Sequence, residues 1–220
     1  MGRMQPALDP ALQPAIDLIL EFEVGGGESY YNRHLIHPTQ PTPSSGITIG
    51  IGYDLGQTTR VEFLDDWRDQ LPDRDRLRLC AAIGLTHHRA AALLPALDNM
   101  TIPWNKALAV FHDKTLVTLG AVGRQFAFSF DTLPPDCRAA LLSLLYNRGA
   151  STRGESRLEM REMQTALKDG LLDHIPVLIR SMKRLWIGKP GGPGLIRRRE
   201  AEAVAFEKGL GALKAPDLRA

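Results

Sequence analysis

The sequence predicts an α+β protein that is mostly helical, with one small β element in its first quarter. Apolar residues recur near the 3.6-residue period of a helix along most of the chain, whereas residues 46–53 are rich in glycine and β-branched residues. Hydrophobic residues make up 44% of the chain and charged residues 24%, which is typical of a protein that buries a core. This composition excludes a disordered tail, a collagen-like fibre and a disulfide-stapled miniprotein.

The first predicted helix spans residues 11–24, where Ile16, Ile19 and Leu20 follow the helical period and glycines 25–27 stop it. Residues 33–45 contain three prolines and predict an irregular stretch, and residues 46–53 predict a short strand or hairpin. From residue 58 onward we expect helices only. Polar caps or prolines mark the starts of most of them, at Thr58 or Thr59, Asp73, Thr86, Pro103 and Pro134-Pro135. The predicted helices run over 58–70, 73–83, 86–97, 103–125, 134–147, 156–169, 172–186 and 194–208.

The cysteines, the residue spacing and the length of the apolar runs exclude several further kinds of protein and site. Cys80 and Cys137 each lie in an apolar helical stretch and are predicted to be buried thiols rather than a disulfide. No spacing of side chains suggests a metal site or a cofactor. No run approaches the roughly 20 apolar residues of a membrane span, so we expect no membrane insertion. The first 17 residues lack the features of a signal peptide, which predicts synthesis in the cytoplasm.

The net charge of +2 conceals an asymmetry along the chain. Residues 1–75 carry 5 Lys/Arg against 12 Asp/Glu, residues 76–150 carry 8 against 4, and residues 151–220 carry 14 against 9. An acidic front joined to a basic remainder indicates either a polyanionic partner or an ordinary solvated surface. The basic run Arg197-Arg198-Arg199 lacks the aromatic interleaving of a nucleic-acid patch, so no nucleic-acid partner is expected.

Glu23 is the residue that the pattern singles out for chemistry. It follows Ile16 by seven residues and Ile19 by four, so it continues the apolar face of its helix. It also lies in the last helical turn, where the macrodipole disfavours another negative charge. Both effects favour the neutral carboxylic acid, which suits a general acid. The alternative is a helix-end glutamate that reaches solvent past the glycines.

The glycine-rich segment after residue 46 has the spacing of neither a dinucleotide-binding loop nor a P-loop. Alternate glycines in a short strand more often let a ligand or another backbone approach closely. Thr48, Tyr53 and Asp54 place polar groups along this segment. It is therefore predicted to form one wall of a cleft opposite the end of the Glu23 helix.

Four segments together resemble a known family. Residues 23–31 (EVGGGESYY) and 46–53 (GITIGIGY) resemble the catalytic segment of phage-type lysozymes, glycoside hydrolase family 24 and its endolysin relatives. Residues 139–149 (AALLSLLYNRG) resemble that family's core helix, and residues 186–188 (WIG) with 194–203 (GLIRRREAEA) resemble its closing helix. The match covers about residues 12–56 and 130–207, in the family's order.

The resemblance implies a lysozyme-like fold: a single domain over residues 1–220. It implies a small β-containing lobe over about 24–57, a helical lobe over about 58–208, and a catalytic acid on helix 11–24. The implied activity is hydrolysis of the glycan bond between N-acetylmuramic acid and N-acetylglucosamine in peptidoglycan. We expect a monomer that needs no cofactor, binds glycan strands, and reaches the cell wall after release or export, as an endolysin or a toxin.

Residue by residue, Glu23 matches the family's catalytic acid and Thr48 its cleft threonine. Two positions depart from the family. Asn32 stands where the family has its catalytic aspartate, and Tyr53 stands where it has a histidine. Tyr30, Tyr31 and Tyr53 are placed to stack on sugar rings, with packing in the core as a nearly equal alternative. The residues expected to bind the substrate are Tyr30, Tyr53 and Asn147.

The identity of the second catalytic group stays open, because a neutral asparagine can be neither a carboxylate nucleophile nor a strong base. Asp54 and Glu28 are candidate replacements, although Asp54 is equally suited to cap a turn before Gly56. Alternatively, Asn32 and Thr48 position a water for single displacement. A protein that has lost catalysis and only binds glycan or another partner is the remaining alternative.

Overall fold

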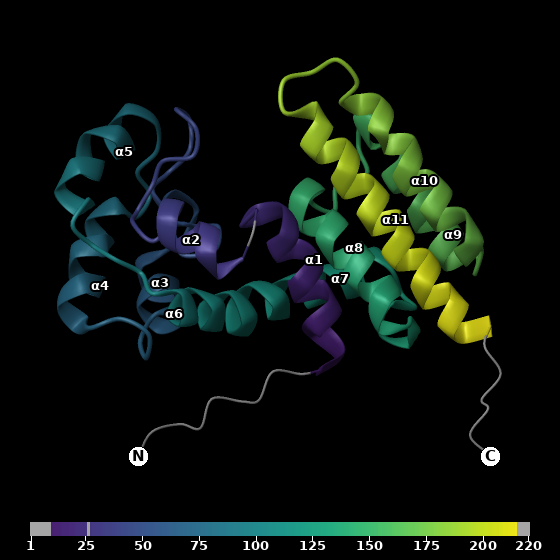
Figure 1. The fold of residues 1–220 in the computed structure, drawn as a ribbon, viewed down its shortest axis with the longest axis horizontal. Helices are drawn as coiled ribbons and strands as arrows, with labels where there is room; N and C mark the ends of the chain where they lie inside the picture. Colours follow the sequence, from purple (N-terminus) through teal and green to yellow (C-terminus); the bar gives the residue numbers. More distant parts are fainter. Residues whose placement is uncertain (1–9, 26, 215–220) are drawn as a thin grey trace. The chain divides into compact units, whose positions relative to one another are not determined.

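The computed structural model describes residues 10–25 and 27–214, which fall into two compact units. The first, called the hairpin unit below, is the continuous stretch 23–117. The second, called the helical unit, combines residues 10–22 with residues 118–214. Helices predominate in both, and a single two-stranded antiparallel sheet completes the described part of the chain, in agreement with the predicted α+β class (Figure 1).

The hairpin unit contains the predicted β element. Strand β1 is Thr48–Ile49 and strand β2 is Tyr53–Asp54, and the register pairs Thr48 with Asp54 and Ile49 with Tyr53. The hairpin predicted over residues 46–53 is thereby confirmed. The helices of this unit are α2 Glu28–His34, α3 Arg60–Asp66, α4 Asp73–Leu79, α5 His87–Leu93 and α6 Trp104–Val110, and a π-helical segment, Phe111–Leu116, follows α6.

The turn between the strands depends on glycine. Gly50 and Gly52 have φ angles of 58° and 72°, a region that side-chain-bearing residues rarely adopt. A Cβ on Gly50 would also lie 3.1 Å from the ring of Trp67, so the turn packs closely on that indole. Trp67 directly follows α3, so this contact packs the hairpin against residues beyond position 57. The compact unit extends to Val117, whereas the sequence predicts a lobe boundary at about residue 57.

Helix starts follow local capping chemistry. The sequence predicts Thr58 or Thr59 as the cap of α3. The structure shows that it is Thr59, which forms a capping box with Glu62. Thr86 occupies the N-cap position of α5, where a helix start is predicted, but its side chain makes no capping hydrogen bond. The prediction for Asp73 was wrong in detail, since Pro72 is the N-cap residue and Asp73 is the first residue of α4. An aspartate there still interacts favourably with the positive end of the helix.

Helix α2 was missed by the sequence prediction, which treated residues after 25 as an interruption and residues 33–45 as irregular. The chain forms a helix again directly after Gly27, the N-cap residue, whose φ of 70° is readily adopted only by glycine. Tyr31 anchors α2, because its fully buried hydroxyl donates to the carbonyl oxygen of Ile102 at 2.8 Å and its ring lies 5.2 Å from that of Trp104. A buried tyrosine needs such an acceptor.

The helical unit is built around two long helices. Its elements are α1 Gln13–Glu23, α7 Val117–Phe126, α8 Pro135–Arg148, α9 Leu158–Lys168, α10 Ile175–Ser181 and α11 Gly192–Lys214. Two end residues, Glu23 of α1 and Val117 of α7, belong to the hairpin unit. Helix α8 lies along α11, and α10 contacts both α9 and α11 (Figure 1). Residues 139–145 of α8 are buried without a break, as expected of a helix covered on all sides.

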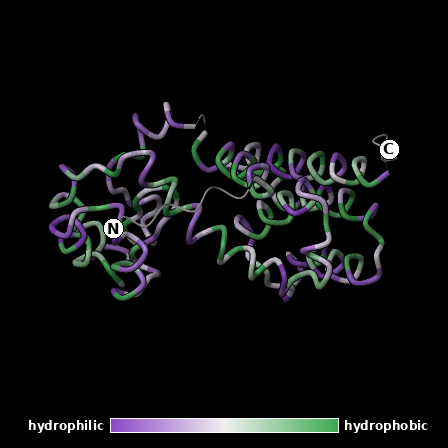
Figure 2. Tube along the Cα trace, turned by 90° about the horizontal axis from the view of Figure 1, so that it is seen from below, coloured by the Kyte–Doolittle hydropathy of each residue, from purple (hydrophilic) through white to green (hydrophobic). Residues whose placement is uncertain are grey.

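Other predicted helices match with shifted ends. The segments 73–83, 86–97, 156–169 and 172–186 each combine an α-helix with a 3-10 turn, and α11 extends to Lys214 rather than residue 208. Hydrophobic and hydrophilic residues are interspersed along the helical parts of the trace, as expected of helices with one buried face (Figure 2). Within residues 10–25 and 27–214, no helix has both the length and the apolar character needed to cross a membrane.

Both cysteines are free thiols, so no disulfide joins them. Cys137 is fully buried on α8, where its Sγ lies 3.3 Å from the carbonyl oxygen of Phe206, and burial raises its pKa to about 12. The prediction of a buried thiol is confirmed for Cys137. Cys80 is only half-buried, because it lies at the end of α4 rather than at a helix–helix contact.

Candidate functional site

Glu23 is the last residue of α1, and its side chain is half-buried. The preceding turns of α1 bury Ile16 and Ile19, while Glu21 on the same helix is exposed. Val24, immediately after Glu23, is fully buried. The sequence therefore identified the correct face of the helix, and Glu23 lies at its edge rather than in the core.

Tyr30 packs against the backbone that follows Glu23. A Cβ on Gly25 would lie 3.8 Å from three atoms of the Tyr30 ring, so the glycine lies directly against the aromatic face. Tyr30 also contacts His34, with ring centroids 4.5 Å apart. Tyr30 remains 37% exposed, which leaves much of its ring available to a ligand.

Thr48 is paired through its backbone on both sides of β1. Its backbone N–H donates to the carbonyl oxygen of Thr39 at 2.7 Å, and its own carbonyl oxygen accepts from Thr39 at 2.9 Å. On the opposite side it is paired with Asp54. Through Thr39, the stretch predicted to be irregular over residues 33–45 thus lies against the free edge of β1, and the Thr48 side chain stays half-exposed.

Asp54 has the turn-capping role that the sequence left open. Its Oδ1 accepts a hydrogen bond from the backbone N–H of Gly56 at 2.8 Å and caps the 3-10 turn Leu55–Gln57. The same oxygen is packed so closely that a Cβ on Gly46 would lie 2.2 Å from it. One oxygen of this carboxylate is therefore committed to the fold.

The Tyr53 side chain packs within the hairpin unit rather than presenting its ring for stacking against a sugar. Its hydroxyl donates to Oδ2 of Asp66 at 2.8 Å, and its ring meets Trp67 edge-on at 5.6 Å. Burial, with the nearby Asp66 carboxylate, raises the pKa of Tyr53 far above its usual value. Oδ1 of Asp66 lies 3.3 Å from Nζ of Lys114, which extends the network to the π-helical segment. These contacts favour the packing interpretation of Tyr53.

Replacing Tyr53 with phenylalanine is expected to destabilise the protein by about 1.5–3 kcal/mol, the contribution of a partly buried hydrogen bond to a charged group. Chemical denaturation of the full chain measures this loss. Tyr30→Phe is the matched control, since no hydrogen bond of its hydroxyl is found among the described residues. Equal stability of the two variants would show that the Tyr53–Asp66 bond contributes nothing.

The remaining predicted residues occupy separate positions. Asn32 lies on the exposed side of α2, and Glu28 is the exposed first residue of that helix. Asn147 lies near the end of α8 in the helical unit, where its Oδ1 accepts from Nη2 of Arg199 at 3.2 Å. The hairpin unit thus contains Glu23, Tyr30, Asn32, Thr48, Tyr53 and Asp54, but not Asn147.

A buried ionic cluster joins α8 to α11. Glu202 is fully buried, and its Oε1 accepts from Oγ of Ser143 at 2.7 Å and from Nη2 of Arg199 at 2.8 Å. Burial raises the pKa of Glu202 and lowers that of Arg199 to about 10. Within the arginine run, Arg198 and Arg199 both pair with Glu202, whereas Glu200 pairs with Arg180.

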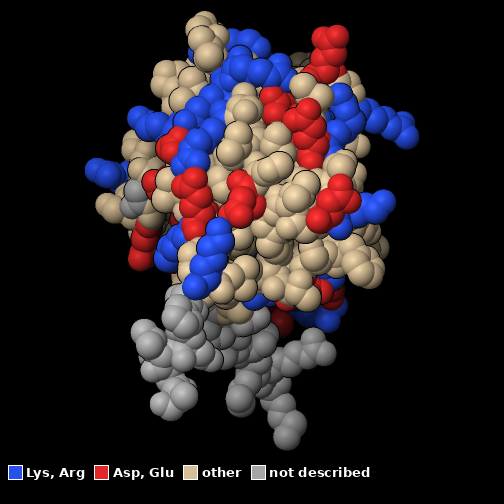
Figure 3. All heavy atoms as spheres, turned by 90° about the vertical axis from the view of Figure 1, so that its right-hand side faces the viewer, with Lys and Arg blue, Asp and Glu red and all other residues tan. Residues whose placement is uncertain are grey.

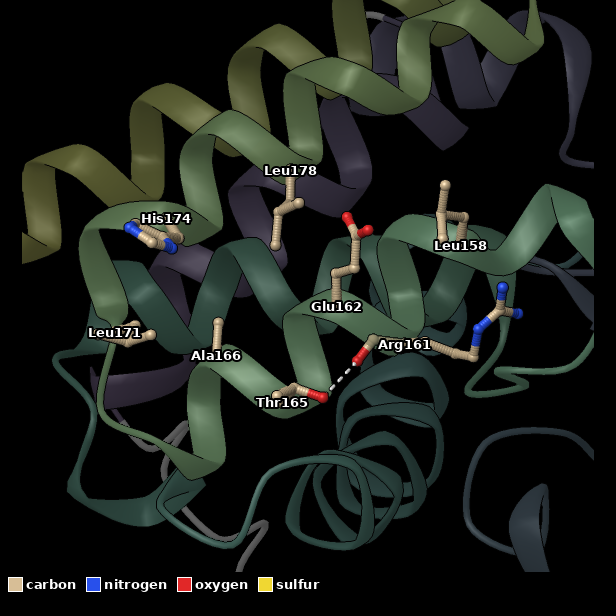
Figure 4. Close-up of a pocket in the computed structure, with 8 residues that line it drawn as sticks. All are labelled: Leu158, Arg161, Glu162, Thr165, Ala166, Leu171, His174 and Leu178. Atoms are coloured by element: carbon tan, nitrogen blue, oxygen red, sulfur yellow. Dashed lines mark hydrogen bonds between the residues drawn. The ribbon is translucent and has the colours of Figure 1, made fainter.

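A surface hollow of about 380 Å³ lies between α9 and α10 (Figure 4). Leucine side chains and Ala166 supply its apolar lining, and Glu162 and His174 are its neighbouring polar groups. None of the residues predicted from sequence lines it. The residues that do are Leu158, Arg161, Glu162, Thr165, Ala166, Leu171, His174 and Leu178.

Charge on the helical unit is mixed where it is drawn in space-filling form. Lys and Arg side chains are interleaved with Asp and Glu on that face (Figure 3). That face therefore shows an ordinary solvated surface rather than one uniformly basic patch. Across the described ranges, 10–25 and 27–214, no three His, Cys, Asp or Glu side chains gather closely enough to hold a metal ion.

Comparison with known families adds one match. The model of a family described as a domain of unknown function, DUF8812, matches residues 18–124. That stretch includes the whole hairpin unit, and with it each predicted site residue except Asn147. No curated protein matches the chain.

Proposed function

We propose that this chain is a peptidoglycan hydrolase of lysozyme-like fold that cleaves between N-acetylmuramic acid and N-acetylglucosamine. The observation that carries the proposal is the order of elements in the hairpin unit. A half-buried glutamate at a helix end, Glu23, is followed by a glycine-dependent antiparallel hairpin that carries Thr48. These two segments are among the four on which the resemblance to phage-type lysozymes rests.

In the proposed mechanism, the Glu23 carboxylic acid donates its proton to the glycosidic oxygen as the bond from that oxygen to the anomeric carbon breaks. A water molecule attacks the anomeric carbon, and its surplus proton passes to solvent. Glu23 is left as a carboxylate and takes up a proton before the next cycle. The products are a new reducing end and a free hydroxyl on the leaving sugar.

The attacking water is assigned to Thr48 and Asn32 rather than to Asp54. The Asp54 carboxylate already accepts from Gly56 and packs against Gly46, so its orientation is set by the turn. Asn32 is exposed and Thr48 is half-exposed, and both lie in the same unit. Without a carboxylate nucleophile, displacement occurs in one step and inverts the anomeric configuration.

Asp54→Asn is expected to retain activity within about threefold, because an asparagine still offers an acceptor to the Gly56 N–H. Thr48→Val, by contrast, is expected to lower the turnover rate by roughly 10²-fold by misplacing the water. Initial rates of peptidoglycan solubilisation compare the two. A loss of 10²-fold or more in Asp54→Asn, at unchanged stability, would make Asp54 the second catalytic group.

Release of dye from covalently labelled, purified peptidoglycan tests the proposed activity itself. The wild-type chain should release soluble dye in proportion to time and protein concentration. Sedimentation of the protein with the insoluble polymer, without dye release, would instead identify a protein that only binds glycan. Neither release nor co-sedimentation would remove peptidoglycan as the target.

A further inference from the structure

The loop after α8 is held together by arginine side chains that donate to backbone carbonyls. Arg148, the last residue of α8, donates from Nη2 to the carbonyl oxygen of Ser156. Arg157 donates in the opposite direction, from Nη1 to the carbonyl oxygen of Arg148 itself. These two reciprocal bonds bring the guanidinium groups of Arg148 and Arg157 to the same loop and fix their orientations.

A third arginine holds the outer part of this loop. Nη1 of Arg161 lies 2.8 Å from the carbonyl oxygens of both Thr152 and Gly154. Between those two residues Arg153 is exposed, and its side chain has no partner among the described residues. We call Arg148, Arg153, Arg157 and Arg161 the arginine cluster.

The nearby carboxylates offset the positive charge of this cluster only in part, although the charge of Glu159 does act on Arg148. Within the described ranges, none of its four members forms an ion pair, and the nearby buried carboxylate, Glu159, is paired with Arg184 at 2.6 Å. Glu155 and Glu162 are exposed neighbours along the chain. Burial, followed by the charge of Arg157, holds the pKa of Arg148 below its usual value. Like charges held together in this way favour a bound anion.

We propose that the arginine cluster binds an oxyanion, a phosphate or carboxylate group carried by a ligand. A guanidinium presents its N–H donors in a planar fork that matches two oxygens of such a group. The backbone carbonyl oxygens orient these guanidinium groups, and because carbonyls are uncharged they leave the positive charge in place. The site involves none of the residues assigned to hydrolysis, so the proposal holds whether or not the chain cleaves peptidoglycan.

Titration of the full chain with inorganic phosphate, and separately with succinate, at constant ionic strength tests the site. Arginine Nε–H resonances in ¹⁵N-edited NMR spectra report on each guanidinium. We expect saturable shifts at Arg148 and Arg157, and a dissociation constant about tenfold higher in Arg157→Gln. Tighter binding of phosphate or of succinate identifies which oxyanion the site prefers.

Arg74→Gln is the matched control, since Arg74 is exposed in the hairpin unit and its replacement removes the same charge. If Arg157→Gln fails to fold, Arg153→Gln serves instead, because that exposed side chain holds no element in place. Absence of saturable shifts in the wild type would overturn the proposal. Equal weakening by the control and the cluster variant would also overturn it, because it would reduce binding to net charge.

Discussion

Glu23→Gln is expected to lower the rate of peptidoglycan hydrolysis by about 10²–10⁴-fold, the usual contribution of a general acid. Glutamine keeps the size of the side chain and its place at the end of α1, but it has no acidic proton to give to the leaving oxygen. Initial rates of dye release from labelled peptidoglycan measure the effect. Affinity for the polymer should change little, since the substitution removes no large contact surface.

The control for this variant lies on the same helix. Glu21 is exposed two residues earlier, so Glu21→Gln makes the same change in charge away from the half-buried position. We expect Glu21→Gln to keep the wild-type rate. Equal rates for wild type, Glu21→Gln and Glu23→Gln would remove Glu23 from the mechanism, while equal losses in both variants would indicate an effect of net charge.

Gly209→Ala is expected to destabilise the protein by about 1–3 kcal/mol through overpacking between α8 and α11. A Cβ at this position would lie 2.5 Å from Sγ of Cys137 and 2.8 Å from its backbone nitrogen. The backbone contact cannot be relieved by rotating a side chain, so the two helices have to separate. The hydrogen bond between Cys137 and Phe206 would be lost with that movement.

Gly211→Ala provides the comparison within the same helix. Nothing lies within 4 Å of a Cβ at Gly211, so alanine adds helix propensity without a clash and should stabilise by about 0.5–1 kcal/mol. Denaturant midpoints of the two variants should therefore move in opposite directions. A Gly209→Ala protein as stable as Gly211→Ala would show that α8 and α11 are not packed this closely.

Patterns local in sequence could be predicted well. The hairpin follows from the glycines at 50 and 52 together with isoleucines at 47, 49 and 51, which are buried. Helix α2 could not be found in this way, because three glycines precede it and its anchor, Tyr31, depends on an acceptor 71 residues away. The acidic start at Glu28 and the basic end at Arg33 and His34 were the available signals.

In the candidate site, too, local features could be predicted from the sequence and contacts between distant residues could not. Glu23 was identified by its place on an apolar helix face, which is a local property. The roles of Asp54 and Tyr53 required the fold, since one depends on a turn geometry and the other on Asp66, thirteen residues later. The arginine cluster gave no sequence signal, because backbone carbonyls become acceptors only when the loop has its final path.

The central claim is that the chain hydrolyses the bond that follows N-acetylmuramic acid. Mass spectrometry of the soluble products from purified peptidoglycan identifies the newly formed chain end. We predict fragments that end in reducing N-acetylmuramic acid, produced by the wild type and by Glu21→Gln but strongly diminished with Glu23→Gln. Fragments ending in reducing N-acetylglucosamine or in an anhydro sugar, or no soluble fragments from the wild type, would contradict it.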